Sequence, residues 1–386
     1  MSHRDAVIVA YGRSAIAKAS KKGFLRDNSP VEYGSEVLRG VLARIPQCKP
    51  ESIGDIVIGC AKPEGVQGMN IGRIIAQRAQ LPDSVPGKTV NRFCASGLEA
   101  IAIGANEIMS GQAEVLAAGG VESMTAIPMG GGAEYRNLWL ESNTHVYMSM
   151  GLTAENVAEI YGVTREDMER MAVESNRKAG RAQDDGLFEK EIIPVTGTNE
   201  AGEPFSFRLD QGVRRTTTME TLAGLKPSFK EDGRVTAATA SQVSDGAAFV
   251  VMMSADKAAE LNVRPIARFV AYAVAGVPAD QMGLGPIRAI PQVMARSGLT
   301  IADMDVIELN EAFAAQAIPC IQALGLDPEK VNPRGGALAL GHPLGATGGI
   351  LTCKALSYLQ DTGGKYALIA MCIGGGMGAA GIIQAI

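Results

Sequence analysis

The alternation of short apolar runs with helical patterns along this chain predicts an α/β fold. Residues 7–10 and 115–118 are apolar runs close to Gly, Asp or Asn, as in strands that are covered on both faces. Helical patterns lie between such runs, and this alternation is typical of layered α/β proteins. The other predicted strands are residues 56–59, 249–253, 306–309 and 367–371, and the predicted helices include 31–44, 97–110 and 287–297.

A weak internal repeat indicates two similar halves. A helical pattern at residues 37–44 is followed by a strand-like segment at 52–59, and residues 290–309 repeat the same order. Cys94 and His342 each lie in a turn that precedes a helical pattern and then a strand-like run. The most reactive-looking residue of each half therefore has an equivalent place in the repeat.

Residues 121–245 interrupt the repeat, because they are rich in Met, Thr, Gly and charged residues. They include the stretch 124–132, a charged helical pattern at 166–185 and a polar stretch at 196–208. Insertions of this length are usually functional. We predict an N-terminal half of residues 1–120 plus 246–262, an inserted domain of residues 121–245, and a C-terminal half of residues 263–386.

Composition and charge narrow the class of protein. The chain has 386 residues, 46% hydrophobic and 20% charged, so a folded globular protein with more than one unit is expected. The net charge of −5 disfavours nucleic acid as the main partner. No apolar run approaches the roughly 18 residues of a membrane span. The N-terminal apolar run is too short for a signal peptide and the last residues are not a peroxisomal signal, so we expect a cytoplasmic protein.

The six cysteines form no C-x-x-C pair, which argues against a zinc ribbon or a redox dithiol. We expect no metal site, and in a cytoplasmic protein the thiols should be reduced. Reduced cysteines are mostly small buried apolar residues, so each one needs a local argument for a role.

The first motif surrounds Cys94, which is followed by small residues and then by an apolar helical face. A Cys at a helix N-terminus gains thiolate stability from the helix dipole and from free N–H groups. A nucleophile needs this stability. A small buried Cys at a tight turn would explain the pattern equally well.

The second motif, residues 335–348, places His342 in a Gly/Pro-rich turn at the start of a helix. Such a His suits proton transfer or oxyanion stabilisation. The two other histidines, His3 and His145, have no comparable setting, although a purely structural role for His342 is the alternative.

The third motif, residues 310–316, joins the end of a buried strand to a helix. Sites in α/β proteins lie at the carboxyl ends of strands, which favours a functional Asn310. The alternative is that Asn310 only caps the helix.

The fourth motif, residues 372–378, begins with Cys372 and continues with glycines. Only eight residues follow Gly378, so no βαβ nucleotide-binding unit can form there. A second reactive Cys followed by free backbone N–H groups fits better, and a Gly-rich turn between two C-terminal strands is the alternative.

Together and in this order, the four motifs closely resemble those of the thiolase family, along essentially the whole chain. The resemblance implies two similar βαβαβαββ halves in a five-layer α-β-α-β-α sandwich, with a loop domain inserted in the first half. Thiolases are CoA-dependent acyltransferases that break or make the carbon–carbon bond of a 3-ketoacyl-CoA. No permanently bound cofactor is implied, because coenzyme A is a co-substrate.

The resemblance also implies catalytic roles. Cys94 would attack the 3-keto carbonyl and become acylated, while His342 would activate Cys94 and help to form one oxyanion hole. Asn310 would hold a water that completes this hole. Cys372 would be the acid/base for the acetyl α-carbon, and the N–H groups of Cys94 and Gly374 would form the second hole. Because this role requires titration near neutrality, we expect the Gly-rich N–H groups and His342 to lower the pKa of Cys372.

The inserted domain resembles the CoA-binding loop domain of the family. Arg214 would meet a phosphate or the adenine, and Phe313 and Met150 would line the acyl pocket. Alternatively, Arg214 is only a solvated charge and Phe229 only a core residue. The positions that match CoA contacts in relatives are Arg214, Thr221, Phe229, Ala237, Ala240 and Ser241.

One departure from the family pattern bears on the substrate. Short-chain biosynthetic thiolases usually carry His-Met-Gly where this chain has Ser149, Met150 and Gly151, and residues 121–129 look more like degradative relatives. The loss of the His leaves room for longer acyl chains. We therefore predict a 3-ketoacyl-CoA thiolase of fatty acid β-oxidation, with an acetyl-CoA C-acetyltransferase as the alternative.

Two other classes fit less well. Ketoacyl synthases share the fold but pair their Cys with two His, or with His and Asn, and this chain has Cys372 and no second suitable His. A non-catalytic acyl-CoA or lipid-binding relative would be expected to lose the nucleophile. For partners, the resemblance implies acyl-CoA thioesters, a homodimer or homotetramer, and in some relatives a hydratase/dehydrogenase subunit.

Overall fold

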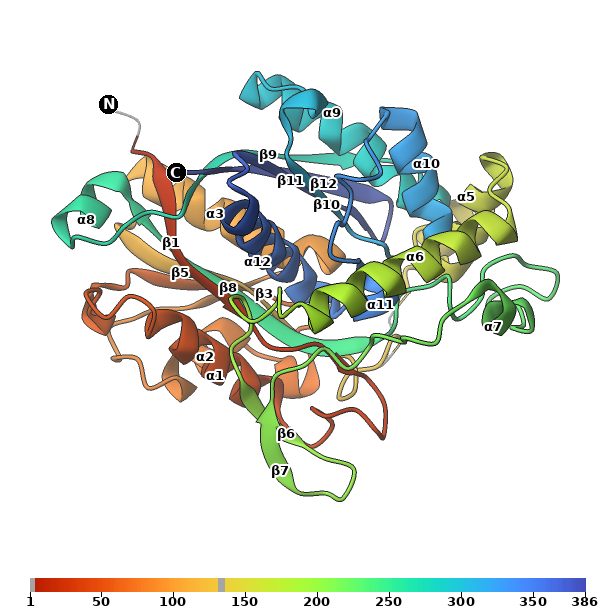
Figure 1. Cartoon of the computed structure of the whole chain (residues 1–386). Coiled ribbons are helices and arrows are strands. Elements are labelled where there is room, and N and C mark those ends of the chain that lie inside the picture. Colours follow the sequence, from red (N-terminus) through yellow and green to blue (C-terminus); the bar gives the residue numbers. More distant parts are fainter. Residues whose placement is uncertain (1–3, 131–135) are drawn as a thin grey trace.

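The computed structural model describes residues 4–130 and 136–386. Figure 1 shows five layers, with α1 and α2 on one outer face, α9 and α10 on the other, and α3 and α12 in the middle. Two β layers separate these helices, which confirms the predicted α-β-α-β-α sandwich. His3 and residues 131–132 of the predicted 124–132 stretch lie outside the described residues.

The first half has the strand order β4-β3-β5-β8-β1. β3 is parallel to β4 and β5, whereas β5, β8 and β1 are antiparallel in turn. Every residue of β5 and β8 is buried, as expected for strands that are covered on both faces. The elements are β1 (Ala6–Arg13), β2 (Ala17–Lys18), α1 (Pro30–Leu42), β3 (Asp55–Gly59), α2 (Ile71–Arg78), β4 (Lys88–Val90), α3 (Ser96–Ser110), β5 (Val115–Ser123), β8 (Ser244–Ser254) and α8 (Ala255–Glu260).

The second half repeats this arrangement with the order β10-β11-β12-β9. β10 is parallel to β11, and an isolated bridge between Ile307 and Val331 takes the place that β4 has in the first half. The predicted repeat of two similar halves is therefore confirmed. The elements are β9 (Ala267–Gly276), α9 (Gly285–Ser297), β10 (Val306–Leu309), α10 (Ala314–Leu324), α11 (Ala337–Leu340), α12 (Leu344–Thr362), β11 (Tyr366–Ile373) and β12 (Met377–Ala385).

The two halves share one mixed sheet, because β1 pairs with β9 at their edges. This junction is short and joins Val7 to Arg268 and Ile8 to Ala267. The helices α3 and α12 pack with the inward faces of both halves in one apolar core, and α1 with α2 and α9 with α10 cover separate cores on the outside.

Between β5 and β8 the chain leaves the sheet and forms helices and a hairpin. The charged pattern at 166–185 is helix α6, and the polar stretch at 196–208 contains the β6–β7 hairpin. Arg13 of β1 anchors the segment, because its guanidinium lies 2.7 Å from the carboxylates of Glu191 and Asp210. The exact domain boundaries stay a prediction. The elements are α4 (Leu138–Asn143), α5 (Met150–Ile160), α6 (Arg165–Asp184), β6 (Val195–Thr198), β7 (Pro204–Phe207) and α7 (Met219–Ala223).

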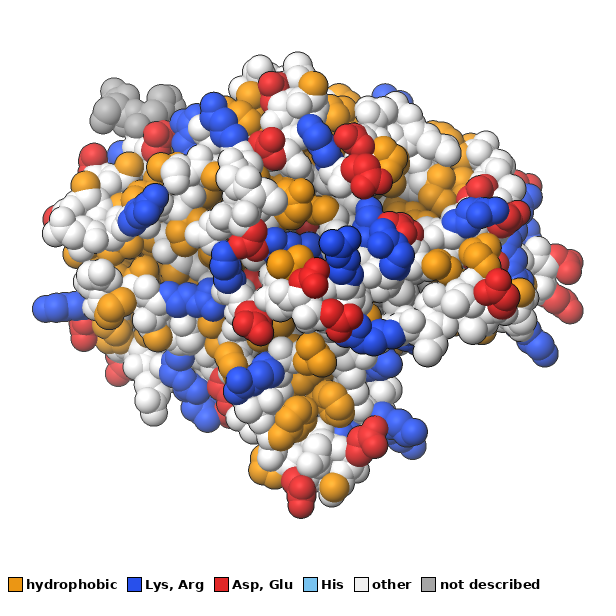
Figure 2. Space-filling model, in the orientation of Figure 1, with side chains coloured by type: hydrophobic (Ala, Val, Ile, Leu, Met, Phe, Trp, Pro, Cys, Tyr) orange, Lys and Arg blue, Asp and Glu red, His pale blue; other side chains and the backbone are white. Residues whose placement is uncertain are grey.

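The surface is mixed in charge. Figure 2 shows acidic and basic side chains interspersed on the face in view, without a continuous basic stripe. In residues 4–130 and 136–386, no helix is both long and apolar enough to cross a membrane.

The first turns of the two central helices meet at glycines. A Cβ atom on Gly97 of α3 would lie 2.8 Å from the carbonyl oxygen of Gly345 in α12, and one on Gly120 of β5 would lie 1.9 Å from the same oxygen. Side chains would therefore force the two helix starts apart. This contact decides where the turns before α3 and α12 lie.

We predict that Gly120→Ala destabilises the protein by about 3 kcal/mol, because the new methyl group overlaps a backbone oxygen that cannot rotate away. The measurement is the midpoint of guanidinium denaturation. Gly276→Ala is the matched control, since a Cβ there meets nothing within 4 Å, and it should change stability by less than about 0.5 kcal/mol. Equal midpoints for the two variants would show that the contact is not tight.

Candidate active site

The turn before α3 holds Cys94 in a strained local structure. Phe93, which precedes it, has a positive φ of 44°, a rare conformation for a bulky residue. Its N–H donates to Asn91 Oδ1 at 2.8 Å, and the Ser96 hydroxyl donates to the Phe93 carbonyl at 2.7 Å. Cys94 is 2% exposed, so its thiol is buried beside the first turn of the helix.

His342 lies in the turn before α12, and both nitrogens of its ring have hydrogen-bond partners. Gly341 has a φ of 109°, which turns the chain sharply into His342. The ring Nδ1 lies 2.6 Å from Thr347 Oγ1, and Nε2 lies 3.3 Å from Asn310 Nδ2. The backbone N–H of His342 donates to the carbonyl of Gln242 at 3.1 Å.

These contacts indicate which nitrogen of His342 carries the proton. Because the amide nitrogen of Asn310 is a donor, Nε2 is the acceptor, and Nδ1 then donates its hydrogen to Thr347. Nε2 is then the unprotonated, basic nitrogen of the ring, and its lone pair faces Asn310. Asn310 itself follows β10 and does not cap α10, whose N-cap residue is Phe313. Its Oδ1 is buried and has no hydrogen-bond partner in the described part of the chain.

Cys372 and Gly374 come from the end of β11 and from the turn that follows it. Cys372 is the penultimate residue of β11, and Gly375 and Gly376 turn the chain with φ values of 79° and 87°. The Gly-rich segment is thus a turn between two strands, as the alternative prediction stated. It is also part of the site, because the N–H of Gly374 interacts with the thiol of Cys94.

Burial keeps all three titratable groups neutral. It raises the pKa of Cys94 to about 11, against the opposing effect of the N–H groups of Gly374 and Cys94. It lowers the pKa of His342 to about 4. Burial, and then the neighbouring Cys94 and Cys320, raise the pKa of Cys372 well above its ordinary value. The expected lowering of the Cys372 pKa is therefore wrong, because burial outweighs the backbone N–H group and a neutral His342 supplies no positive charge.

A cavity of about 310 Å³ opens onto Cys94 and His342. Phe229 and Phe313 meet edge-to-face across it, with ring centroids 5.9 Å apart. Phe229 is 40% exposed, so it is not a core residue. Five of the predicted substrate-binding residues line this cavity: Met150, Phe229, Ala240, Ser241 and Phe313.

Three predicted CoA contacts do not line the cavity. Arg214 is exposed and lines a separate cleft of about 500 Å³ along α6, with Arg215 and other cations. The hydroxyl of Thr221 completes the N-terminal cap of α7. Ala237 is exposed in a turn three residues before Ala240.

Several residues that line the cavity or contact its lining were absent from the sequence-based prediction. Thr347 lies inside the second motif, in the first turn of α12. Its hydroxyl, five residues after His342, was the only sign in the sequence that it could contact the imidazole. Met282, Gln242 and Leu344 also line the cavity or contact its residues. Met282 comes from a short 3₁₀ segment before α9, which no motif marks.

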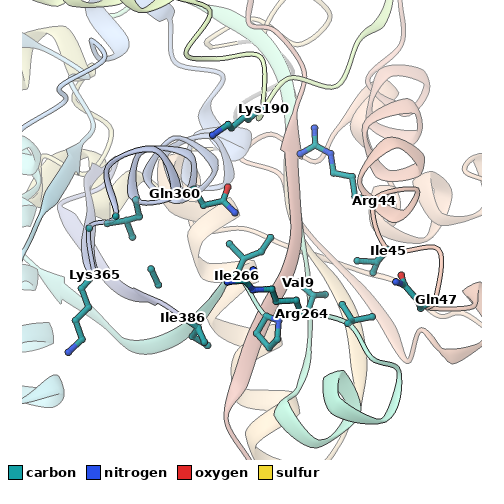
Figure 3. Close-up of a pocket in the computed structure, with 16 residues that line it drawn as sticks. Val9, Arg44, Ile45, Gln47, Lys190, Arg264, Ile266, Gln360, Lys365 and Ile386 are labelled. Carbon is teal, nitrogen blue, oxygen red and sulfur yellow. The ribbon is translucent and has the colours of Figure 1, made fainter.

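A wider cleft of about 1060 Å³ lies at the other end of α12, beside its C-terminus (Figure 3). Its labelled cations are Arg44, Lys190, Arg264 and Lys365. Among the described residues that line it, there is no Cys, His, Asp or Glu. It therefore has no thiol, imidazole or side-chain carboxylate among these residues. The cavity at Cys94 has a thiol and an imidazole, together with directed N–H groups, and could support acyl transfer through sulfur.

In the described residues no cluster of His, Cys, Asp or Glu could hold a metal ion. The chemistry of the site is that of thiols, an imidazole, an amide and backbone N–H groups.

Comparisons with known proteins agree on one family. The family profile "Thiolase, N-terminal domain" matches residues 6–256, and "Thiolase, C-terminal domain" matches residues 263–385. The chain is 46% identical to a 3-ketoacyl-CoA thiolase of Bacillus subtilis, with 99% of each chain covered. It is 44% identical to a peroxisomal 3-ketoacyl-CoA thiolase of Homo sapiens, with 99% of this chain and 91% of that protein covered. The crystal structure of an acetyl-CoA acetyltransferase of Bacillus anthracis matches with a TM-score of 0.91 and 37% identity, with 100% of both chains covered.

We predict that alkylation of Cys94 by iodoacetamide rises with pH, with a midpoint near 11. The pKa of the thiol is raised, so the reactive thiolate is scarce at neutral pH. The rate should be followed by the mass of the peptide that contains Cys94. A midpoint at or below about 8 would instead indicate a preformed thiolate–imidazolium pair, and would contradict the neutral resting state.

Proposed function

The chain belongs to the thiolase family, and we propose that it is a 3-ketoacyl-CoA thiolase that works through an acyl-Cys94 intermediate. The observation that carries this proposal is that Cys94 and His342 line one apolar cavity, while the N–H of Gly374 interacts with the Cys94 thiol. The names of the relatives from Bacillus subtilis and Homo sapiens support the substrate class.

In the first half-reaction, His342 Nε2 takes the proton of Cys94 and the sulfur attacks the 3-keto carbon. The oxyanion then collapses, the bond between carbons 2 and 3 breaks, and an acetyl-CoA enolate leaves. Cys372 gives its proton to carbon 2, so that acetyl-CoA is released. Cys94 now carries the shortened acyl group as a thioester, Cys372 is a thiolate and His342 is an imidazolium.

In the second half-reaction, coenzyme A enters and the Cys372 thiolate takes the proton from its thiol. The CoA sulfur attacks the thioester, and Cys94 leaves with the proton that His342 holds. The products are acyl-CoA and the resting enzyme. The neutral resting state fits this cycle, because each proton is transferred only when a substrate is present.

Two features of the site support the proposed oxyanion holes. The N–H groups of Cys94 and Gly374 both interact with the Cys94 thiol, so they point to where negative charge develops. The orphaned Oδ1 of Asn310 supports its proposed role of holding a water, since a buried acceptor of this kind needs a donor.

The lining of the cavity supports an acyl substrate. Met150, Phe229 and Phe313 are apolar, and Ser149 stands where short-chain biosynthetic relatives carry His. We infer that the acyl chain lies between these residues and that Arg214 binds the phosphates or adenine of CoA. Thr221, Ala237, Ala240 and Ser241 would line the path between the two regions.

The wider setting is also part of the proposal. We infer a cytoplasmic homodimer or homotetramer that acts in fatty acid β-oxidation. An acetyl-CoA C-acetyltransferase is the second candidate, which is favoured by the name of the Bacillus anthracis neighbour. The two activities share the same residues and differ in the acyl chain that the cavity accepts.

We predict that thiolysis of 3-ketoacyl-CoAs proceeds faster with chains longer than four carbons, because the cavity offers apolar contact beyond the keto carbon. The measurement is kcat/KM over a panel of chain lengths. Activity restricted to acetoacetyl-CoA would contradict the degradative assignment and favour the acetyltransferase. Activity that survives Cys94→Ala would contradict the mechanism.

We predict that Cys372→Ala separates the two chemical steps. Acetyl-CoA should still acetylate Cys94, but exchange of its α-protons with D₂O should fall by roughly 10³-fold, because a positioned proton-transfer group is lost. The exchange is followed by NMR, and the acetylation by intact mass. Exchange at the rate of the wild-type enzyme would show that another group moves this proton.

A further inference from the structure

The register of the two halves shows which residue of the first half corresponds to Cys372. Gly59, the last residue of β3, pairs with Gly120, and Leu309, the last residue of β10, pairs with Ala370. Glu122 and Cys372 each lie two residues beyond these partners. Cys94 and His342 likewise each lie two residues before their helix. Glu122 is therefore the counterpart in the first half of Cys372 in the second half.

Glu122 is a buried carboxylate that accepts hydrogen bonds on both oxygens. Its Oε2 accepts from the N–H groups of Ala61 and Gly345, both at 2.8 Å. Its Oε1 accepts from Gln67 Nε2 at 2.9 Å and from the N–H of Lys62 at 3.3 Å. Burial raises the pKa of Glu122, and the hydrogen bonds from Ala61, Gln67, Gly345 and Lys62 oppose this rise. Because these donors occupy both oxygens, the hydrogen bonds favour the ionised form of the carboxyl group. The N-terminus of α12 adds a favourable dipole.

Two hydrogen-bond partners of Glu122 lie close to the proposed catalytic residues: Gly345 lies near His342, and Ala61 lies near Cys94. Gly345 is the second residue of α12 and follows His342 by three residues, so the bond to Glu122 holds the turn that carries the imidazole. Ala61 packs in one small cluster with Cys94 and Leu344. One carboxylate thus ties the start of α12 to the wall behind the nucleophile.

The charge of Glu122 also acts on the nucleophile. Burial has the largest effect on the pKa of Cys94 and raises it, and the two N–H groups lower it. The charge of Glu122 adds a further, smaller increase. Cys60 and Tyr33 are the other titratable groups that face Glu122, and burial raises the pKa of both. They are therefore neutral at physiological pH and do not offset its charge.

We propose that Glu122 is a positioning residue for the thiolytic reaction: its ionised carboxylate holds the start of α12, and with it His342, against the turn that carries Cys94. Glu122 does not touch the substrate cavity. It acts through His342 and Cys94. This inference rests on the function proposed above.

The test compares Glu122→Gln with Glu122→Asp. Glu122→Gln removes the charge and places an N–H₂ group against donors, so kcat should fall about 10- to 100-fold, as for displaced catalytic groups, while KM changes little. The midpoint for alkylation of Cys94 by iodoacetamide should move to lower pH. Glu122→Asp keeps the charge but cannot reach both Ala61 and Gly345, so kcat should fall while the midpoint stays near that of the wild type.

Glu169→Gln is the matched control, because Glu169 is also a buried carboxylate but pairs with Arg165 on α6. It should leave kcat and the midpoint unchanged. The proposal is overturned if Glu122→Gln has the kcat and the alkylation midpoint of the wild type. It is also overturned if kcat falls only in proportion to the amount of folded protein and the alkylation midpoint does not change. Should Glu122→Gln not fold, an unchanged kcat in Glu122→Asp overturns it. If the wild type does not cleave 3-ketoacyl-CoAs, the proposed function fails, and the alkylation midpoints still report the effect of Glu122 on Cys94.

Discussion

The contact between the first turns of α3 and α12 is the constraint on which the site depends. Gly97, Gly120 and Gly345 have no side chains where the two helix starts and β5 meet. Because the nucleophile lies two residues before one helix and the imidazole two residues before the other, this contact brings both into one cavity. The sheet layers and outer helices hold the two central helices in that position. Glu122 adds a polar link at the same place, since it accepts the N–H of Gly345.

Burial has opposite effects on thiols and imidazole, and both effects keep the resting site uncharged. A thiolate loses more by leaving water than the two N–H groups return, so the pKa of Cys94 is high, whereas the pKa of His342 is low. A neutral nucleophile beside a neutral base is less prone to oxidation or alkylation than a thiolate. The same N–H groups can stabilise negative charge that develops on the substrate, because they are already directed at the thiol of Cys94. The arrangement therefore favours the transition state over a reactive resting enzyme.

Much of the fold was predictable because it depends on local patterns. The buried strands are continuous apolar runs, and the turns before α3 and α12 carry Gly, Pro and small residues. The repeat could therefore be recognised in the amino-acid sequence. The family resemblance then supplied the proposed roles of Cys94, His342, Asn310 and Cys372. The same resemblance predicted Met150 and Phe313 as lining residues of an acyl pocket, and Phe229, Ala240 and Ser241, predicted as CoA contacts, line the same cavity.

The remaining features depend on contacts between distant segments. The donors to Glu122 come from segments that are far apart in the chain. Thr347 contacts the imidazole of His342 only because of the conformation of the turn between them. The pKa of Cys372 was predicted in the wrong direction, because the sequence shows the glycines but not how completely the thiol is buried. Arg214 lines a different cleft from the cavity at Cys94, so its contact with CoA is still a proposal.

In the proposed mechanism Cys94 becomes acylated and then passes the acyl group to coenzyme A. Intact-mass spectrometry of the enzyme, after it is mixed with a 3-ketoacyl-CoA in the absence of free CoA, tests this step. We expect one added acyl group per chain, two carbons shorter than the substrate, located on Cys94 by peptide mapping and removed when CoA is added. No adduct, or an adduct on another residue that persists after CoA is added, would contradict this mechanism.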